Sequence, residues 1–284
     1  MKELLSFEAR RRFGNHLYLV LATACFLVAL VPLISILYQT ILLGAAAINI
    51  GFFSQVTPPI GGSGGGILNA LEGSLIMVGL ACSVGIPIGV LGGAYLSEYP
   101  GRISYYVRLI SEVLTGVPSI VTGIFVYELI VVTQHRFSAF SGGVALGFMM
   151  IPIVAISTNE SLKLVSSSIR EGGLALGISR AKTLLYILLS SARSGVITGI
   201  ALAVARVMGE TAPLLFTALG SQFMMTSLND PAASLTLLIF DFGTSAYDNA
   251  HVLAWGAALV LLLIVLGLNI VVRAASRLKV KGNE

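Results

Sequence analysis

Residues 196–219 read VITGIALAVARVMGETAPLLFTAL, a stretch of apolar and small residues that contains two charged side chains, Arg206 and Glu210. The stretch is long enough to cross a bilayer as a helix, which takes about 20 residues. A charge at mid-bilayer costs about 2.5–3.5 kcal/mol on insertion scales, so it rarely faces lipid. A spacing of four residues puts both side chains on one helical face, where each partly neutralises the other. The stretch therefore predicts a membrane helix with one polar face.

This polar face has two interpretations. The charged pair can hold two helices together, or it can line a polar path along which Arg206 meets a crossing anion. A guanidinium offers paired donors suited to a tetrahedral oxyanion and stays charged at physiological pH. Glu210 would then occupy Arg206 until the anion arrives, or bond to another subunit. We expect the path, with Arg206, Glu210 and Thr211 on it; Thr198 could add a hydroxyl, although a membrane-helix threonine more often bonds to its own backbone.

The composition excludes a soluble protein. Of the 284 residues, 56% are hydrophobic and 11% are charged, and the mean hydropathy is +0.93. Soluble domains carry about 25% charged residues. The two cysteines, Cys25 and Cys82, both lie in apolar segments, and no His, Asp or Glu cluster has catalytic or metal-ligand spacing. An integral membrane protein without a metal site or catalytic centre is therefore expected.

Six apolar segments approach or exceed the length of a membrane helix, which predicts an all-α integral membrane protein with one domain, residues 1–284. The third segment contains Glu112, Pro118 and Glu128 and is expected to be bent or shielded by neighbours. The spans are Leu17–Leu43, Asn69–Leu96, Tyr105–Val132, Phe140–Ser157, Ser191–Leu219 and Val252–Val272.

The basic residues predict the orientation of these spans. Fifteen of the 17 Lys and Arg residues fall on one side of the membrane, Arg136 alone falls on the other, and Arg206 lies within it. Positive charge marks the cytoplasmic side, so both termini are expected in the cytoplasm and nucleic acid is not expected as a partner. On the outer side, Asp230-Pro231 followed by residues 232–240 predicts a capped short helix at the interface. The fifteen are Lys2, Arg10, Arg11, Arg12, Arg102, Arg108, Lys163, Arg170, Arg180, Lys182, Arg193, Arg273, Arg277, Lys279 and Lys281.

Residues 159–190 form the longest inward-facing polar segment. Leu162, Val165 and Ile169 recur at helical spacing, which predicts amphipathic helices, broken where glycines follow. Such a segment suits a groove on another protein. Its basic residues also suit a helix resting on anionic lipid headgroups. Periodicity alone does not separate these two possibilities.

The same segment resembles the cytoplasmic loop of binding-protein-dependent ABC importer permeases. That loop has the pattern Glu-Ala-Ala, three residues, Gly, nine residues, Ile-x-Leu-Pro. Here Glu171-Gly172-Gly173 is followed by three residues ending in Leu176, then by Gly177, and after nine residues by Ile187-Leu188-Leu189-Ser190. The spacing matches throughout. Glycines replace both alanines and Ser190 replaces the proline, which affects the stability of the loop's helix and the way the chain enters the fifth span.

A second resemblance narrows the family. Residues 206–216, RVMGETAPLLF, are similar to the fifth-helix signature of phosphate-specific importer permeases of the A type, and residues 114–123, LTGVPSIVTG, to their third-helix segment. The resemblance covers nearly the whole chain. It implies a type I ABC importer permease fold and a subunit that forms half of a phosphate pathway in a bacterial inner membrane.

The resemblance also implies an assembly. Its other members would be a related second permease, two cytoplasmic ATPase subunits and a periplasmic phosphate-binding protein, with membrane lipids around them. The coupling residues would be Glu171, Gly172, Gly173, Leu176 and Gly177. The chain has no phosphate-binding Gly-Lys-Ser/Thr motif, so we expect no cofactor and no enzymatic activity in it, with ATP and Mg²⁺ held by the partner ATPase.

Two alternatives stay open on the residues alone. A permease for another oxyanion, such as sulfate, molybdate or phosphonate, would also use Arg206. A secondary anion transporter would work without ATP, but such transporters often show inverted repeats, and none is visible here.

Overall fold

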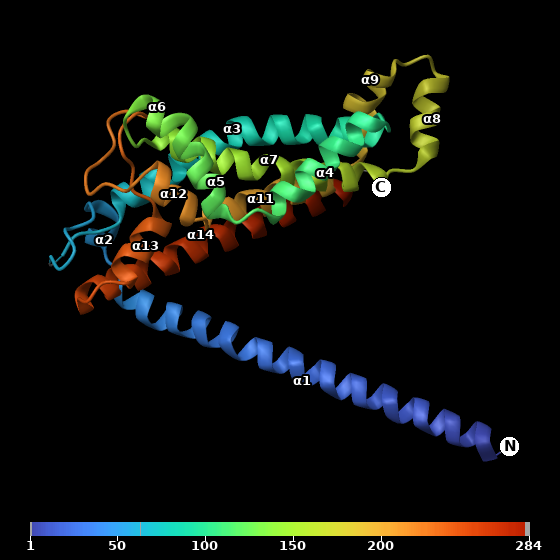
Figure 1. Cartoon of the computed structure of the whole chain (residues 1–284), viewed down its shortest axis with the longest axis horizontal. Coiled ribbons are helices and arrows are strands. Elements are labelled where there is room, and N and C mark those ends of the chain that lie inside the picture. The colour runs from blue at the N-terminus through green and yellow to red at the C-terminus, as the bar shows by residue number, and fades with distance from the viewer. Residues whose placement is uncertain (1, 63, 282–284) are drawn as a thin grey trace.

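The computed structural model describes residues 2–62 and 64–281, and the regular elements in these two ranges are all helical (Figure 1). One isolated β-bridge joins Leu219 and Ala232. The elements are α1 (Lys2–Ala47), α2 (Ile50–Ser54), α3 (Leu68–Glu98), α4 (Arg102–Gly116), α5 (Ser119–Val126), the π-helix η1 (Tyr127–Val131), α6 (Val132–Gln134), α7 (Ala139–Lys163), α8 (Ser167–Ala175), α9 (Arg180–Lys182), the π-helix η2 (Thr183–Leu188), α10 (Leu189–Ser191), α11 (Arg193–Met208), α12 (Ala212–Thr217), α13 (Leu235–Gly243) and α14 (Asp248–Lys281).

Four helical segments in the described part of the chain are long and apolar enough to cross a membrane, namely Gly14–Ala47, Leu68–Glu98, Ala139–Lys163 and Asp248–Ala274. Two further candidates are bent helix pairs. If each bent pair is one crossing, the structure has up to six spans, as the sequence predicts. The all-α, multi-span fold class is confirmed.

The third predicted span is not one straight helix over residues 105–132. The chain bends by 105° between Arg102–Gly116 and Ser119–Gln134. Proline disfavours helical geometry in the residue before it, and Val117, which precedes Pro118, is extended with φ −67° and ψ 132°. The bend that Pro118 indicated in the sequence is therefore present, and it is sharper than a kink within a continuous helix.

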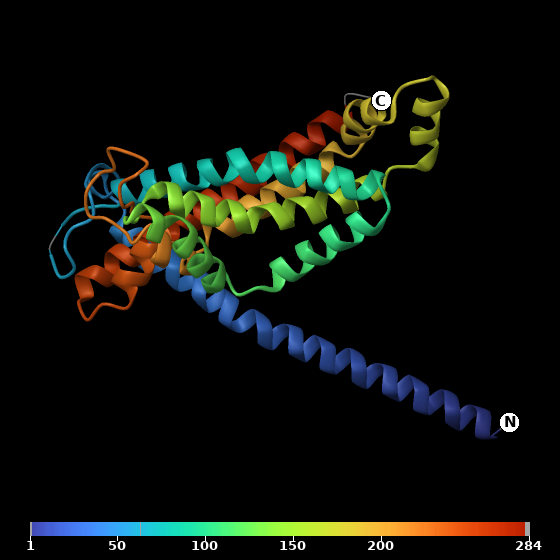
Figure 2. The same cartoon turned by 45° about the horizontal axis from the view of Figure 1, so that its top comes forward.

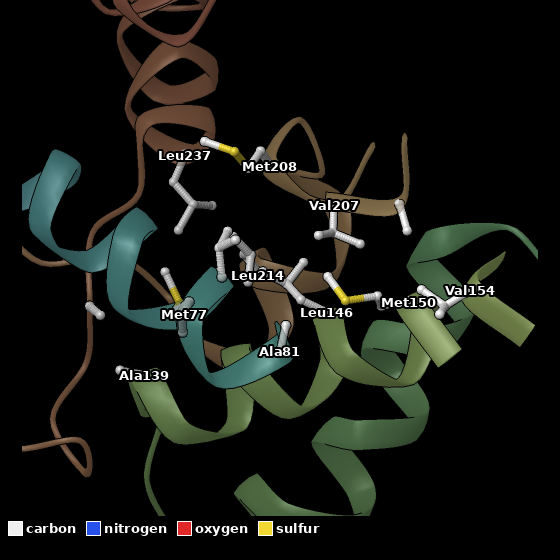
Figure 3. Packing of buried hydrophobic residues seen from close by; sticks show 14 residues of the cluster. Met77, Ala81, Ala139, Leu146, Met150, Val154, Val207, Met208, Leu214 and Leu237 are labelled. Atoms are coloured by element: carbon white, nitrogen blue, oxygen red, sulfur yellow. The ribbon is translucent and has the colours of Figure 1, made fainter. Parts of the chain in front are cut away.

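The core of the bundle lies where α3 and α7 run side by side. Gly85, Gly89 and Gly93 recur every fourth residue of α3 and so share one face. A Cβ at Gly89 would lie 2.6 Å from Val154 Cβ, and one at Gly93 would lie 2.3 Å from the Ala155 carbonyl oxygen. Small residues let membrane helices approach this closely, which is how they gain packing contacts in lipid. Figure 3 shows the adjoining cluster, in which Met77, Leu146, Val207, Leu214 and Leu237 bring together α3, α7, α11, α12 and α13.

Helix α1 leaves this bundle, and its C-terminal end packs against α14 (Figures 1 and 2). Its apolar segment is unburied within the chain. The N-terminal end of α1, the end of α14, and helices α8 and α9 all lie at one end of the molecule's long axis.

The predicted short helix after Asp230-Pro231 begins later than expected. Helix α13 starts at Leu235, and Ser234 caps it by accepting a hydrogen bond from the Leu237 amide. Asp230 instead closes a turn, accepting hydrogen bonds from Thr226 Oγ1 at 2.7 Å and the Ser227 amide at 2.8 Å. The Thr226 hydroxyl, followed by the Ser227 amide, holds the pKa of Asp230 below its usual value. The predicted cap was therefore wrong because the aspartate bonds backward along the chain.

Candidate functional site

The predicted fifth span, residues 191–219, breaks beside its charged pair. Helix α11 ends at Met208, and α12 begins at Ala212 with Pro213 in its first turn. Proline has no amide hydrogen, so a helix cannot continue through it with every hydrogen bond made. The Leu214 amide, which would reach the Glu210 carbonyl in a continuous α-helix, donates to the Thr211 carbonyl at 3.0 Å. The Glu210 carbonyl accepts a hydrogen bond from Thr236 Oγ1 of α13 at 2.9 Å. Glu210 and Thr211 therefore lie in a break between helices, and the prediction of one continuous helical face was wrong.

Arg206 and Glu210 nevertheless lie together. Arg206 is in the last turn of α11, and its Nε is 3.9 Å from Glu210 Oε1. This distance makes an ion pair but is too long for a hydrogen bond. The Arg206 side chain is 50% exposed and that of Glu210 is 17% exposed. A half-exposed guanidinium at the end of an apolar helix, held only loosely by its neighbour, can accept another anion.

Arg206 belongs to an exposed line along α11. Thr198, Leu202 and Arg206 are four residues apart, and all three are exposed. The Thr198 hydroxyl donates to the Ser194 carbonyl at 2.8 Å, which is the backbone bond expected of it. A groove of about 660 Å³ lies on another side, between α11, α13 and α14, and it is lined mainly by apolar residues such as Ala205, Leu261 and Val265. Arg206 and Glu210 do not line that groove.

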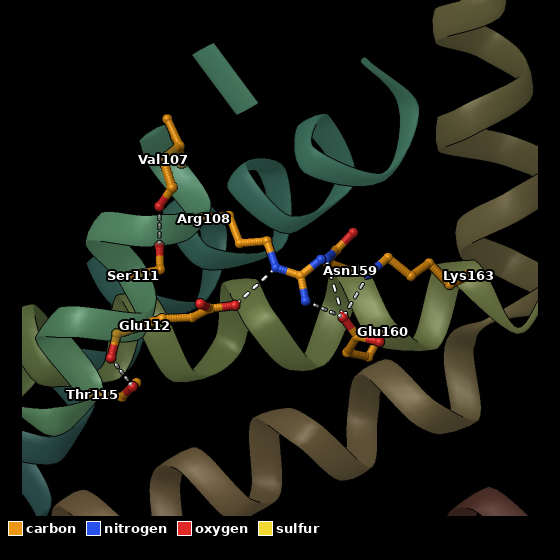
Figure 4. A network of polar contacts seen from close by, with 8 residues as sticks. All are labelled: Val107, Arg108, Ser111, Glu112, Thr115, Asn159, Glu160 and Lys163. Carbon is orange, nitrogen blue, oxygen red and sulfur yellow. Dashed lines mark hydrogen bonds and ion pairs between the residues drawn. The ribbon is translucent and has the colours of Figure 1, made fainter. Parts of the chain in front are cut away.

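Glu112 belongs to a different group of charged side chains from that of Arg206 and Glu210. Glu112 accepts a hydrogen bond from Arg108 Nε at 2.8 Å, and Arg108 Nη2 lies 3.6 Å from Glu160 of α7 (Figure 4). Lys163 donates to the same Glu160 oxygen at 2.8 Å. This network, with side chains about half exposed, joins α4 to α7, so Glu112 takes part in holding these two helices together. Across the described ranges no group of three or more His, Cys, Asp or Glu residues could hold a metal ion.

The predicted coupling segment, residues 159–190, contains the end of α7, the projecting helices α8 and α9, and η2. At its start, Asn159 and Glu160 are still part of α7. At its end, residues 180–191 form a helical segment that meets α11 at an angle of 76°. Ser190, which stands where the resembling loop has proline, lies inside α10, the last part of that segment. The chain therefore enters its fifth span through a bent helix.

The three glycines of this segment have different surroundings. The prediction that Gly172 and Gly173 break the helix was wrong, because α8 runs through both and ends at Ala175. Gly177 lies just after the end of α8 with φ +75°, the left-handed geometry that commonly ends a helix. A Cβ at Gly173 would lie 2.9 Å from Thr183 Cγ2, whereas one at Gly172 would meet nothing within 4 Å. Glu171 is exposed and Leu176 is 81% exposed, so both face outward from the bundle.

One residue of this region, Glu98, was not identified from the sequence as a candidate functional residue. Glu98, the last residue of α3, has a side chain that is only 2% exposed. Arg180 Nε donates to Glu98 Oε1 at 3.1 Å, and Arg170 Nε lies 3.2 Å from Oε2. We call these three residues the Glu98 cluster. The signal in the sequence was a carboxylate at the end of an apolar segment, but both partners lie more than 70 residues away along the chain.

Comparison with known proteins assigns the family. Residues 85–281 match the family described as "Binding-protein-dependent transport system inner membrane component". The "Phosphate transport system permease protein PstA" of Yersinia pestis is 42% identical, with the match covering 94% of this chain and 91% of that protein. The protein of the same name from Haemophilus influenzae is 42% identical over 93% and 94% of the two chains. The "Probable phosphate transport system permease protein PstA" of Methanocaldococcus jannaschii is 34% identical over 95% and 96%.

Solved structures show the fold. A chain of the MetNI methionine ABC transporter, in an inward-facing conformation, matches with a TM-score of 0.56 at 17% identity, covering 76% of this chain and 93% of that one. A chain of an amino acid ABC transporter matches with a TM-score of 0.56 at 16% identity, covering 74% and 92%. This protein thus shares its fold with chains of these two ABC transporters. Because the family match spans residues 85–281 and the similarity to PstA proteins spans nearly the whole chain, this multi-pass inner-membrane protein belongs to the binding-protein-dependent transport system inner membrane components, as a PstA-like permease.

Proposed function

We propose that this chain is a permease subunit of an ATP-driven phosphate importer and forms half of the translocation pathway. The observation that carries the proposal is the half-exposed Arg206, paired only loosely with Glu210, in a largely apolar membrane segment. The relatives that match nearly the whole chain are named as phosphate transport permeases, which favours phosphate among the oxyanions.

Arg206 is the residue that we propose meets the anion. Ion pairs with exposed members contribute only about 0–1 kcal/mol, so an arriving phosphate competes readily for the guanidinium against Glu210 at 3.9 Å. Transport needs binding that is weak enough to release the anion. A single arginine with an adjacent carboxylate meets that need better than a closed cage of donors. We also assign Thr211, which follows Glu210 in the break after α11, to the pathway.

The orientation follows from charge. With fifteen Lys and Arg residues on one side of the spans, we assign that side to the cytoplasm. Both termini then lie in the cytoplasm. Helices α8 and α9, which lie at the same end of the long axis as the ends of α1 and α14, would also be cytoplasmic.

The cytoplasmic helices would receive the driving force. We assign Glu171, Gly172, Gly173, Leu176 and Gly177 to docking on a separate ATPase, because α8 projects from the bundle and carries the exposed Leu176 at its end. ATP and Mg²⁺ would be bound and hydrolysed there, so this chain would transport without catalysing a reaction. A second permease, the other ATPase copy and a periplasmic phosphate-binding protein complete the proposed assembly.

The test is substitution of Arg206 in cells that express the whole transporter. R206Q removes the charge while keeping a polar side chain, so phosphate uptake should fall at least about a hundredfold, as expected when an anion loses its cationic partner at mid-membrane. The ATPase should still co-purify with the variant. R102Q, which removes an exposed arginine at the start of α4, is the matched control and should import phosphate normally. Near-normal uptake by R206Q would show that Arg206 is only structural.

A further inference from the structure

The Glu98 cluster joins three elements at the base of the projecting helices. Glu98 ends α3, Arg170 lies in the middle of α8, and Arg180 begins α9. The Glu98 side chain is 2% exposed, whereas those of Arg170 and Arg180 are 32% and 55% exposed. A buried carboxylate therefore lies between two arginines that reach it from the surface.

Nothing in α3 itself favours a carboxylate at this place. The C-terminal end of a helix carries a partial negative charge, which repels an acidic side chain. Burial adds the cost of removing the charge from water, which is compensated only by good ion-pair partners. Both partners of Glu98 come from the segment between α7 and α11. The two arginines therefore stabilise the buried carboxylate, and the same contacts hold the segment between α7 and α11 against α3.

The two arginines hold Glu98 unequally. Arg180 donates a hydrogen bond from Nε at 3.1 Å, and its Cζ lies 5.5 Å from the centroid of the Tyr99 ring, within range of a cation–π contact. Arg170 Nε lies 3.2 Å from Oε2, but the pair lacks hydrogen-bond geometry. Arg180 is therefore the stronger contact and Arg170 the weaker one.

We propose that Glu98 is a positioning residue that couples the ATPase-docking helix α8 to the membrane bundle, an inference that rests on the function proposed above. The chain itself connects α8 only to α7 and, through η2, to α11. The Glu98 cluster adds a connection to α3, the helix that packs most extensively along α7. Movement of α8 on ATP binding would then displace α3 together with α7 and α11, rather than bend the connecting segments alone.

Coupling ATP hydrolysis to transport requires a firm connection between the docking helix and the bundle. An ATPase can do work on the pathway only if its two states interact differently with two arrangements of the permease. A docking helix on flexible connections would follow the ATPase without moving the bundle. With the Glu98 cluster intact, movement of α8 is transmitted to α3; without it, ATP hydrolysis continues while import falls.

The experiment compares E98Q, R180Q, R170Q and the double variant E98Q/R180Q in the assembled transporter in lipid nanodiscs and in proteoliposomes. E112Q is the matched control, because it removes a carboxylate that is 51% exposed and pairs with an arginine of its own helix. Two quantities are measured: hydrogen–deuterium exchange of residues 167–182, and phosphate imported per ATP hydrolysed.

The proposal predicts that E98Q exchanges about tenfold faster in residues 167–182, equivalent to about 1.4 kcal/mol of local opening. Import per ATP should fall about fivefold or more while hydrolysis persists, since transport and hydrolysis are no longer linked. R180Q should have a larger effect than R170Q, and the double variant should resemble E98Q, because residues of one network do not act additively. E112Q should match the wild type in both measurements. If the E98Q complex does not assemble, the R180Q complex tests the proposal instead, because the substituted Arg180 side chain is half-exposed.

Three results would overturn the proposal: wild-type exchange and coupling in E98Q, equal effects of E112Q, or additive losses in the double variant. Failure of the proposed function is distinguishable from these. If the wild-type complex imports no phosphate, the substrate assignment fails. The exchange measurement, which needs no substrate, still determines whether Glu98 holds α8 on the bundle.

Discussion

At the scale of single residues, the proposed site consists of a cation and a carboxylate that are near each other but not hydrogen-bonded. The 3.9 Å separation and the half-exposed guanidinium are the basis of our proposal that Arg206 exchanges Glu210 for another anion. The break after α11 produces this geometry, because Glu210 has left the helix and its backbone is held by Thr236 of α13. The Glu210 backbone is thus held by α13, and the Glu210 side chain is much less exposed than that of Arg206.

This geometry predicts the effect of Glu210→Gln. Without the carboxylate, a phosphate on Arg206 has no competitor and leaves more slowly. The maximal import rate should fall about tenfold, equivalent to about 1.4 kcal/mol in the limiting barrier, while the ATPase still co-purifies. E210D, which keeps the charge, should stay close to the wild type. E128Q, which removes an exposed carboxylate from η1, serves as the control. Unchanged import by E210Q would argue against any exchange between Glu210 and the anion.

Arg206 and Glu210 could be found in the sequence because charges in an apolar stretch are costly and therefore conspicuous. Glu98 could not be found in this way. Its partners, Arg170 and Arg180, lie in another segment, and no local pattern shows that they meet a carboxylate at the end of α3. Contacts of this kind depend on how the helices pack, which periodicity does not specify.

At the scale of elements, helix α8 packs closely against η2. Gly173 is buried, and a Cβ there would lie 2.9 Å from Thr183 Cγ2 and 3.2 Å from Ile187 Cδ1. Gly172 is next to it in the same helix but faces open space. The resembling loop has alanine at both positions. In this chain an alanine fits at 172 without any change, whereas at 173 the buried Thr183 has to shift.

The prediction for this element compares Gly173→Leu with Gly172→Ala. At 173 the larger side chain cannot fit beside Thr183, so α8 should separate from η2 and recovery of the ATPase in pull-down should fall about tenfold, since overpacking costs about 1–3 kcal/mol. At 172 an added Cβ meets no atom of this chain within 4 Å, and alanine is the residue that the resembling loop has there. G172A should therefore keep the wild-type recovery and raise α8 stability by up to about 1 kcal/mol through its higher helix propensity. Circular dichroism of each purified chain checks the fold. Equal recovery with G173L and G172A would mean that the α8–η2 contact does not support docking.

The breaks in the third and fifth spans were partly visible in the sequence. Pro118 indicated the bend at Val117, but hydropathy alone could not give its angle of 105°. Gly209 and Pro213 surround the break after α11, yet the apolar residues on both sides gave an uninterrupted signal over residues 196–219. Proline and glycine are tolerated within membrane spans where neighbours satisfy the backbone. Here Thr236 does so for Glu210, and that contact comes from a segment 26 residues further along the chain.

At the scale of the whole molecule, composition was enough to predict the fold class. A chain with 11% charged residues and a mean hydropathy of +0.93 has too little polar surface for water, and its apolar segments gave all four unbroken candidate spans. The orientation of α1 relative to the other helices could not be predicted, because the sequence of a long apolar helix does not specify which helix it packs against. In the described part of the chain α1 packs mainly against α14, and most of its apolar segment is unburied.

The most direct test of the central claim is phosphate transport by the purified complex in proteoliposomes. This chain, its second permease and the ATPase are reconstituted together, and radiolabelled phosphate uptake is measured with binding protein present, with and without ATP. The account predicts accumulation only with ATP, competition by unlabelled phosphate but not by sulfate, and loss of uptake in R206Q. Uptake by this chain alone, driven by an ion gradient without ATP, would contradict it.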